Sequence, residues 1–230
     1  MKIYVEEAVF SLLPRFTLFC LQADMGSLRL GDRSPMADLK TAVESVKGRE
    51  KKEEGLPLPD PLKPWREAFK KFTADKGASC SLDLLLSRAR TGTVESMGPV
   101  DETVKAVSLY FSVPISAMDL SEVRGFLGLC LSRGRDPFLD EEKENLTREG
   151  EVCYMDKLGA ASRCINWKIS SRLKATEESR KILFISESVN ADSRMRTAEA
   201  VKDLDRRLQA YFGAKTRFFV LDSTQMAKRI

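Results

Sequence analysis

The chain contains no histidine, so any catalysis must use carboxylates, hydroxyls, thiols, backbone groups or the substrate itself. This absence excludes Ser-His-Asp and Cys-His nucleophile systems, histidine general bases and H-E-x-x-H zinc sites. The sequence also has no G-x-G-x-x-G motif and no P-loop, which argues against a cradle for nucleotide phosphates. The candidates for chemistry are therefore a few carboxylates and one asparagine between residues 101 and 166.

The first candidates are the adjacent carboxylates Asp101 and Glu102, which precede an apolar segment. At the start of a helix they would interact favourably with the helix dipole. Alternatively, they would bind an amine or position a water molecule. Asp119 follows the loop-like residues 114–118, where it would cap a helix with Glu122 as its capping-box partner.

Asn166 and Trp167 lie in a predicted strand, with Arg163 and Lys168 close by. An asparagine in a strand must find hydrogen-bond partners, either at a pocket or in the surrounding water. Trp167 would stack on a base or another ring, or else pack in the core. Both interpretations of each residue stay open on the sequence alone.

The surrounding elements mix strands and helices without regular alternation. Runs rich in apolar and β-forming residues predict strands at 3–5, 15–21, 126–131, 151–155, 162–167 and 181–186, with a strand or packed tail at 218–221. Apolar periodicity and end signals predict helices at 36–46, 64–72, 82–90, 103–111 and 195–212. Ser81 is the predicted N-cap of the third helix and Gly92 its stop. This order favours an α+β fold over a doubly wound sheet.

Composition and charge restrict the class of protein. Hydrophobic residues make up 43% and charged residues 31% of the 230 residues, as in an ordinary soluble globular protein. The formal net charge of +4 is mild, although basic residues gather between 163 and 217. That gathering is either a solvated surface or a contact strip for phosphates.

The five cysteines form no C-x-x-C pair, which argues against a disulfide framework or a structural zinc site and favours free buried thiols in a reducing cytosol. The N-terminal residues turn acidic at once, unlike a signal peptide. No apolar run approaches the roughly 20 residues needed to span a bilayer. We therefore expect a cytoplasmic protein that has no membrane partner and no metal or other cofactor. The sequence contains no pattern that fixes an oligomeric state.

Several motifs occur in an order that resembles the B3/B4 editing domain of the phenylalanyl-tRNA synthetase beta chain and its free-standing relatives. Residues 97–109 (MGPVDETVKAVSL) fit the family pattern I-N-P-L-V-D-x-Y-N-A-V-S-L, and 113–120 (VPISAMDL) fit L-P-V-G-x-x-D-L. Residues 150–156 (GEVCYMD) and 162–168 (SRCINWK) match G-E-V-V-Y-x-D and C-R-R-W-N-W-R. The resemblance covers residues 65–212, and the order and spacing of the motifs make it more specific than any single motif.

The resemblance implies a three-layer α+β fold with a β-sandwich-like core and flanking helices. We therefore expect a single domain over 1–230. It would comprise N-terminal strands and a helix at 1–46, an exposed charged and proline-rich loop at 47–63, the family core at 64–212, and a C-terminal tail at 213–230.

The resemblance also implies hydrolysis of a wrongly charged aminoacyl-tRNA in trans, with tRNA as the partner. The matching motif positions would place Glu102, Asp119 and Asn166 as catalytic residues. Lys105, Ser116, Arg163 and Trp167 would contact the substrate or the tRNA.

Some polar residues of the family pattern differ in this chain. Gly98 and Lys105 replace the two asparagines of the first motif, and Ser116 replaces a glycine of the second. Two alternatives to editing therefore stay open. The first is a catalytically inactive module that binds RNA or an amino acid, and the second is a small-molecule hydrolase or sensor that uses no nucleic acid.

Overall fold

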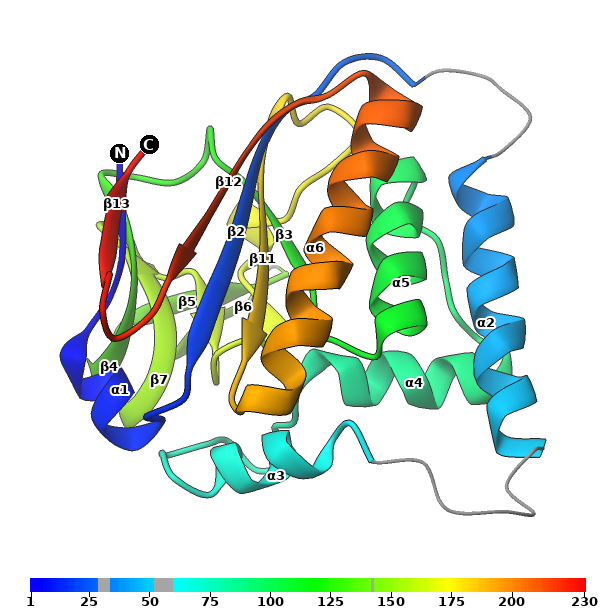
Figure 1. Cartoon of the computed structure of the whole chain (residues 1–230). Coiled ribbons are helices and arrows are strands. Elements are labelled where there is room, and N and C mark those ends of the chain that lie inside the picture. The colour runs from blue at the N-terminus through cyan, green and yellow to red at the C-terminus, as the bar shows by residue number, and fades with distance from the viewer. Residues whose placement is uncertain (29–33, 52–59, 142) are drawn as a thin grey trace.

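The computed structural model describes residues 1–28, 34–51, 60–141 and 143–230, which form a mixture of helices and strands (Figure 1). The strands do not alternate regularly with the helices, so the α+β prediction is confirmed. None of the helices in the described residues is long and apolar enough to cross a membrane.

A four-stranded antiparallel sheet forms the middle layer. Its strand order is β12, β2, β11, β3, with bounds Lys215–Leu221, Thr17–Asp24, Lys181–Ser188 and Ser116–Asp119. The long β2–β11 pair aligns Thr17 with Ser188 and Asp24 with Lys181. Side chains alternate between the two faces of a strand. This sheet therefore packs on both sides, with Leu18 and Cys20 in one apolar cluster and Phe19 and Leu21 in another.

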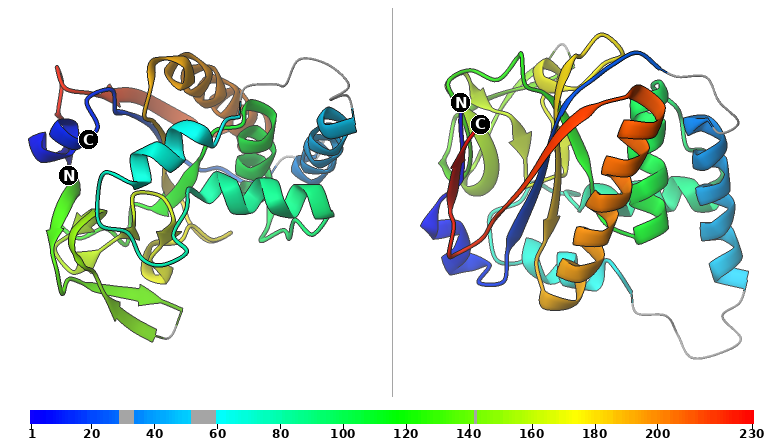
Figure 2. Two further views of the ribbon diagram at one scale, coloured as in Figure 1. Left: turned by 90° about the horizontal axis from the view of Figure 1, so that it is seen from below. Right: turned by 45° about the horizontal axis from the view of Figure 1, so that its top comes forward.

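Helices α5 (Pro99–Phe111) and α6 (Ala191–Phe212) cover one face of this sheet. Helices α2 (Pro35–Lys51) and α4 (Ser81–Thr91) pack against α5. Figures 1 and 2 show α5 and α6 beside the sheet, α2 outside α5, and α4 crossing below them. Leu204 and Leu208 of α6 pack with Val104 and Val107 of α5. The apolar residues whose periodicity predicts these two helices therefore form the buried face of each helix.

A second sheet covers the other face. Its order is β13, β1, β4, β7, β8, with bounds Ala227–Arg229, Lys2–Val5, Phe126–Arg133, Glu149–Asp156 and Gly159–Ala160. Leu127 and Leu129 of β4 pack in the same cluster as Leu18 of β2. The Met1 ammonium donates a hydrogen bond of 2.8 Å to the Ile230 carbonyl, so the two ends of the chain meet here. The layers are thus sheet, sheet and helices.

Smaller elements complete the fold. They are helix α1, helix α3 and the hairpin strands β5 and β6, with bounds Glu7–Leu12, Lys63–Phe69, Pro137–Asp140 and Lys143–Leu146. The sequence patterns predicted α3 but not the other three.

The strand predicted at 162–167 is wrong beyond its first two residues. β9 (Ser162–Arg163) and β10 (Lys168–Ile169) form a small hairpin, and residues 164–167 are the turn between them. Cys164 and Ile165 have φ values of 46° and 62°, in the left-handed region that side chains rarely adopt. Both residues are fully buried, so the turn lies inside the protein. Its apolar residues therefore give the same sequence pattern as a buried strand.

Two further boundaries differ from the predictions. The loop predicted at 47–63 is wrong at its start, because α2 continues through Lys47 to Lys51. Lysine, arginine and glutamate favour helix, so a charged run does not end one. The rest of that prediction falls largely on 52–59, outside the described residues. Of the loop-like residues 114–118, the last three form the edge strand β3 together with Asp119, and this strand pairs with β11.

Candidate functional site

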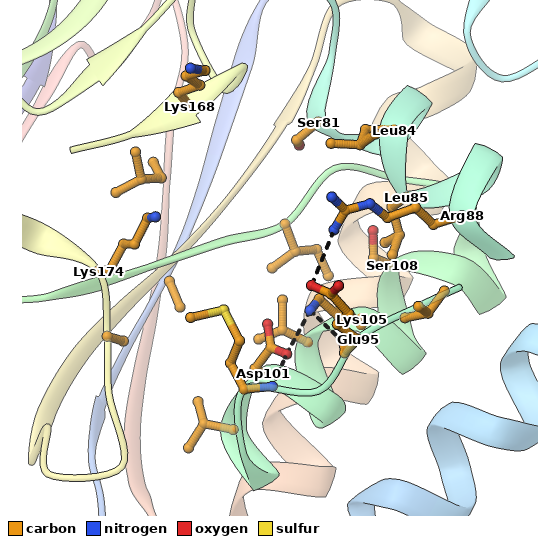
Figure 3. Close-up of a pocket in the computed structure, with 18 of the residues that line it drawn as sticks. Ser81, Leu84, Leu85, Arg88, Glu95, Asp101, Lys105, Ser108, Lys168 and Lys174 are labelled. Atoms are coloured by element: carbon orange, nitrogen blue, oxygen red, sulfur yellow. Dashed lines mark hydrogen bonds and ion pairs between the residues drawn. The ribbon is translucent and has the colours of Figure 1, made fainter. Parts of the chain in front are cut away.

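A cavity of about 480 Å³ lies between the helices and the small hairpin (Figure 3). Its walls come from α4, the segment 94–97, α5, residues 115–117, residues 140–141, the β9–β10 hairpin and residues 174–175. Segments that are far apart in the sequence therefore line the same cavity.

Helix α5 supplies one wall of the cavity. Val100, Asp101, Val104, Lys105 and Ser108 line it, at spacings that lie on one face of a helix. The Lys105 ammonium lies 2.7 Å from Asp101 Oδ2 and 2.8 Å from the carbonyl oxygen of Glu95. These contacts tie the helix to the segment before it and fix the direction of both charged side chains.

The start of α5 is set by its local sequence. Gly98 is the N-cap residue with a φ of 108°, which a glycine adopts without strain, and Pro99 occupies the first turn. Asp101 and Glu102 lie in the same turn, as predicted from their favourable interaction with the helix dipole.

The opposite wall carries Trp167, Lys168 and Lys174. The Lys168 ammonium lies 5.0 Å from the centre of the Trp167 ring and 2.5 Å from Asp140 Oδ2. Figure 3 shows Lys168 and Lys174 across the cavity from Lys105 and Asp101. A flat ring and two cations therefore face a wall that mixes apolar and charged groups.

All residues that line the cavity fall within the segment matched by a family model. The model of the B3/4 domain matches residues 64–212, most of the chain. The chain belongs to the B3/4 domain family. The resemblance expected from the motifs is thereby confirmed at the level of the family.

A solved structure is similar to this B3/4 domain protein along almost its whole length. It is the crystal structure of an N-terminal fragment of the phenylalanyl-tRNA synthetase beta-subunit from Pyrococcus horikoshii, with a TM-score of 0.46 and 11% sequence identity. The similarity covers 94% of this chain and 50% of that one, so this chain spans about half the length of the fragment. A comparison with curated proteins found no match.

Of the residues predicted for the site of this B3/4 domain, Lys105 and Trp167 line the cavity and five others do not. Ser116 lies in β3 between Ile115 and Ala117, both of which line the cavity, so its side chain points to the other face. Glu102 is buried and accepts a hydrogen bond of 2.5 Å from the Ser96 hydroxyl.

Asp119 binds protein groups away from the cavity. Its carboxylate accepts hydrogen bonds from the Ser121 N–H at 2.8 Å and from the Ser179 hydroxyl at 2.5 Å. Asp119 therefore connects the end of β3 to the segment that precedes β11.

Arg163 is buried in an ion-pair network. Its guanidinium lies 2.6 Å from Glu151 Oε1 and 2.6 Å from Asp75 Oδ2. Burial acts to raise the pKa of Glu151, but hydrogen bonds from Arg163 and from the Arg148 N–H outweigh it, and the pKa is lowered. In this protein Arg163 thus stabilises the junction of β7, the β9–β10 turn and the loop that follows α3.

Asn166 joins a second buried network. Its Nδ2 donates to Glu187 Oε2 at 3.0 Å, and its Oδ1 accepts from the Ser81 N–H at 3.4 Å. Tyr154 donates its hydroxyl to the other Glu187 oxygen at 2.9 Å. Burial raises the pKa of Glu187 to about 7, although the hydrogen bonds from Asn166 and Tyr154 act to lower it. The requirement that Asn166 find partners is met inside the core and at the start of α4.

The motif positions do not point to three charged residues that line the cavity, Asp101, Arg88 and Lys174. The sequence signals Asp101, because it is adjacent to Glu102 and could bind an amine or position water, and it signals Lys174 as part of the basic run after Arg163. It gives no signal for Arg88, because only the packing of α4 across α5 brings this residue to the cavity.

Metal and thiol chemistry have little support in the described residues. Among them, no group of three or more His, Cys, Asp or Glu side chains is arranged to hold a metal ion. All five cysteines are free and buried, as predicted. Burial raises the pKa of the Cys20 and Cys80 thiols, so both remain neutral.

Proposed function

We propose that this protein binds the aminoacylated 3′ end of a tRNA in the cavity and hydrolyses the ester of a wrongly charged molecule. One observation carries the proposal: Lys105 and Trp167, both predicted to contact substrate, line one cavity together with the Asp101 carboxylate. The cavity volume of about 480 Å³ falls within the range of about 300–1,000 Å³ typical of ligand sites.

The reaction needs a positioned water molecule. The water molecule loses a proton as its oxygen attacks the ester carbonyl carbon, the bond from that carbon to the ribose oxygen breaks, and the ribose oxygen takes up a proton. The products are a free amino acid and an uncharged tRNA. Because an aminoacyl ester is already reactive, a group that orients the water is a useful contribution, and general bases supply typically about 10²–10⁴-fold.

We assign the orientation of this water to Asp101. Its Oδ2 accepts hydrogen bonds from the Lys105 ammonium at 2.7 Å and from the Met97 N–H at 3.0 Å. Among the described residues, none donates to Oδ1, so that oxygen is available to a water molecule. The adjacent Lys105 holds the carboxylate in a fixed direction.

A specific observation favours a second candidate, a module that binds the same end of tRNA without hydrolysing it. The predicted catalytic residues Glu102, Asp119 and Asn166 all have protein partners outside the cavity. Their catalytic roles stay predictions, and a binding module would need none of them.

Deacylation of mischarged tRNAs tests the proposal. Wild-type protein is expected to accelerate loss of the amino acid from at least one aminoacyl-tRNA, and Asp101→Asn to lower that rate by about 100-fold. Asp192→Asn is the matched control, because this exposed aspartate lies in the first turn of α6 and does not line the cavity. No acceleration with any aminoacyl-tRNA, combined with tight tRNA binding, would establish the second candidate.

A further inference from the structure

The charged residues that line the cavity are mostly paired with one another. Three cations lie next to three carboxylates in the pairs Arg88–Glu95 at 4.0 Å, Lys105–Asp101 at 2.7 Å and Lys168–Asp140 at 2.5 Å. Two charged residues remain, Lys174 and Glu141, and neither has an ion pair within the described part of the chain. Both are exposed.

The two lining residues without an ion pair indicate where the cavity would bind a charged group of a ligand. A paired cation gains little from a new anion, because it must give up part of an existing contact. Within the described residues, the ammonium of Lys174 has no such contact to lose, and Figure 3 shows it across the cavity from Asp101 and Lys105. An anionic group of a ligand would therefore bind best at Lys174.

One part of the cavity wall is apolar and well buried. Val100 and Val104 of α5 contribute to it together with Ile115 and Ala117, and more than nine tenths of the Val104 and Ile115 surface is buried. Ser108 is the hydroxyl on this face of α5, and it already donates to the carbonyl oxygen of Val113. A polar ligand group would lose its hydrogen bonds to water here, whereas an apolar group would gain from burial.

We infer that the ligand of this cavity has an apolar end, held between α5 and β3, and an anionic end, paired with Lys174. The inference rests on the proposed function. For an aminoacyl-tRNA, the apolar end is the amino-acid side chain and the anion is a phosphate of the terminal nucleotide. For a free apolar amino acid the anion is the carboxylate. In both ligands Glu141 is available to the α-ammonium group.

Titration calorimetry with three stable probes tests whether the cavity binds an apolar end and an anionic end of its ligand separately. The first probe is adenosine 5′-monophosphate that carries phenylalanine through a 3′-amide, the second lacks the phosphate, and the third carries serine instead. We expect wild-type protein to bind the second and third probes about tenfold more weakly than the first. In Lys174→Ala, removal of the phosphate is expected to change the affinity by less than about twofold, because its partner is gone. Lys202→Ala, an exposed lysine of α6, is the control and is expected to bind like wild type.

Each alternative result bears on the inference. Equal affinity with and without phosphate, equal affinity for the serine and phenylalanine probes, or no binding of any probe would overturn it. Hydrolysis of aminoacyl-tRNA alongside such a result would leave the proposed function standing. Free phenylalanine that binds as tightly as the first probe, and depends on Lys174, would support the inference but contradict a tRNA ligand.

Discussion

Replacement of Glu187 by glutamine is expected to stabilise the protein at neutral and alkaline pH. Glu187 is buried, and its carboxylate accepts hydrogen bonds from Tyr154 and Asn166. Among the described residues, no cation forms an ion pair with Glu187, so its charge is not compensated when it ionises. Glutamine imitates the protonated acid, since its amide donates toward the Tyr154 oxygen while its carbonyl accepts from Asn166.

The magnitude follows from the shift in pKa. Burial raises the pKa of Glu187 from 4.5 to about 7. At one pKa unit per 1.36 kcal/mol, ionising the buried group costs about 3 kcal/mol of folding stability. Because the folded pKa lies above the unfolded value, wild-type stability is fully present below pH 4.5. It falls as the pH rises and levels off above about 7.

Urea unfolding between pH 5 and 8 at constant ionic strength measures this effect. The difference in unfolding free energy between Glu187→Gln and wild type is expected to be small at pH 5 and to reach about 3 kcal/mol at pH 8. Glu199→Gln, an exposed glutamate on α6, should show no such trend. A difference between Glu187→Gln and wild type that stays constant with pH would refute the reasoning, as would one that shrinks as the pH rises.

Three further outcomes follow from other parts of the structure. Arg163→Met should lower the free energy of urea unfolding by about 3–5 kcal/mol, because it leaves the fully buried Glu151 without its cation; a loss below about 1 kcal/mol would contradict the buried ion pair. Gly92→Ala should lower the same free energy by about 1–2 kcal/mol, since Gly92 ends α4 with a φ of 72° and the nearest atom to an added Cβ is the flexible end of Lys47; an unchanged midpoint would argue against this C-cap. In fluorescence titrations, the logarithm of the tRNA affinity should fall linearly with the logarithm of the salt concentration, as phosphate contacts require, and salt-independent binding would exclude them.

The sequence predicted the fold best where one periodicity dominates. In α6, apolar residues recur every three or four positions, and Leu204 and Leu208 form the face that packs on the sheet. In β11 a short run of apolar residues buries both faces of the strand. Each pattern fits the packing of only one kind of regular element, a helix in the first case and a buried strand in the second.

Prediction failed where the backbone departs from regular structure or where tertiary contacts assign the role. Cys164 and Ile165 adopt positive φ in a buried turn, and neither residue type signals that conformation. The motif position of Arg163 predicts a contact with the substrate or the tRNA, whereas the structure pairs it with Glu151 on β7, twelve residues earlier. Such a pairing depends on how the hairpin folds back, which local spacing does not reveal.

Two of the residues predicted for the site lie together for the same kind of reason. Lys105 and Trp167 line the cavity because helical spacing and a turn next to β10 orient them there. Glu102 is adjacent to Asp101, but one step along a helix rotates a side chain by about 100°. The motif therefore points to a turn of α5 that reaches the cavity, and the structure shows that Asp101 is the carboxylate of that turn that lines it.

The measurement that tests the central claim most directly is single-turnover hydrolysis of a bound mischarged tRNA. Wild type and Asp101→Asn would be compared at protein concentrations that saturate the tRNA. We predict that the rate constant falls by about 100-fold in Asp101→Asn while the dissociation constant changes by less than about threefold. Equal rate constants for the two proteins, or a wild-type rate no faster than spontaneous hydrolysis, would contradict the assignment of this cavity as the site of ester cleavage.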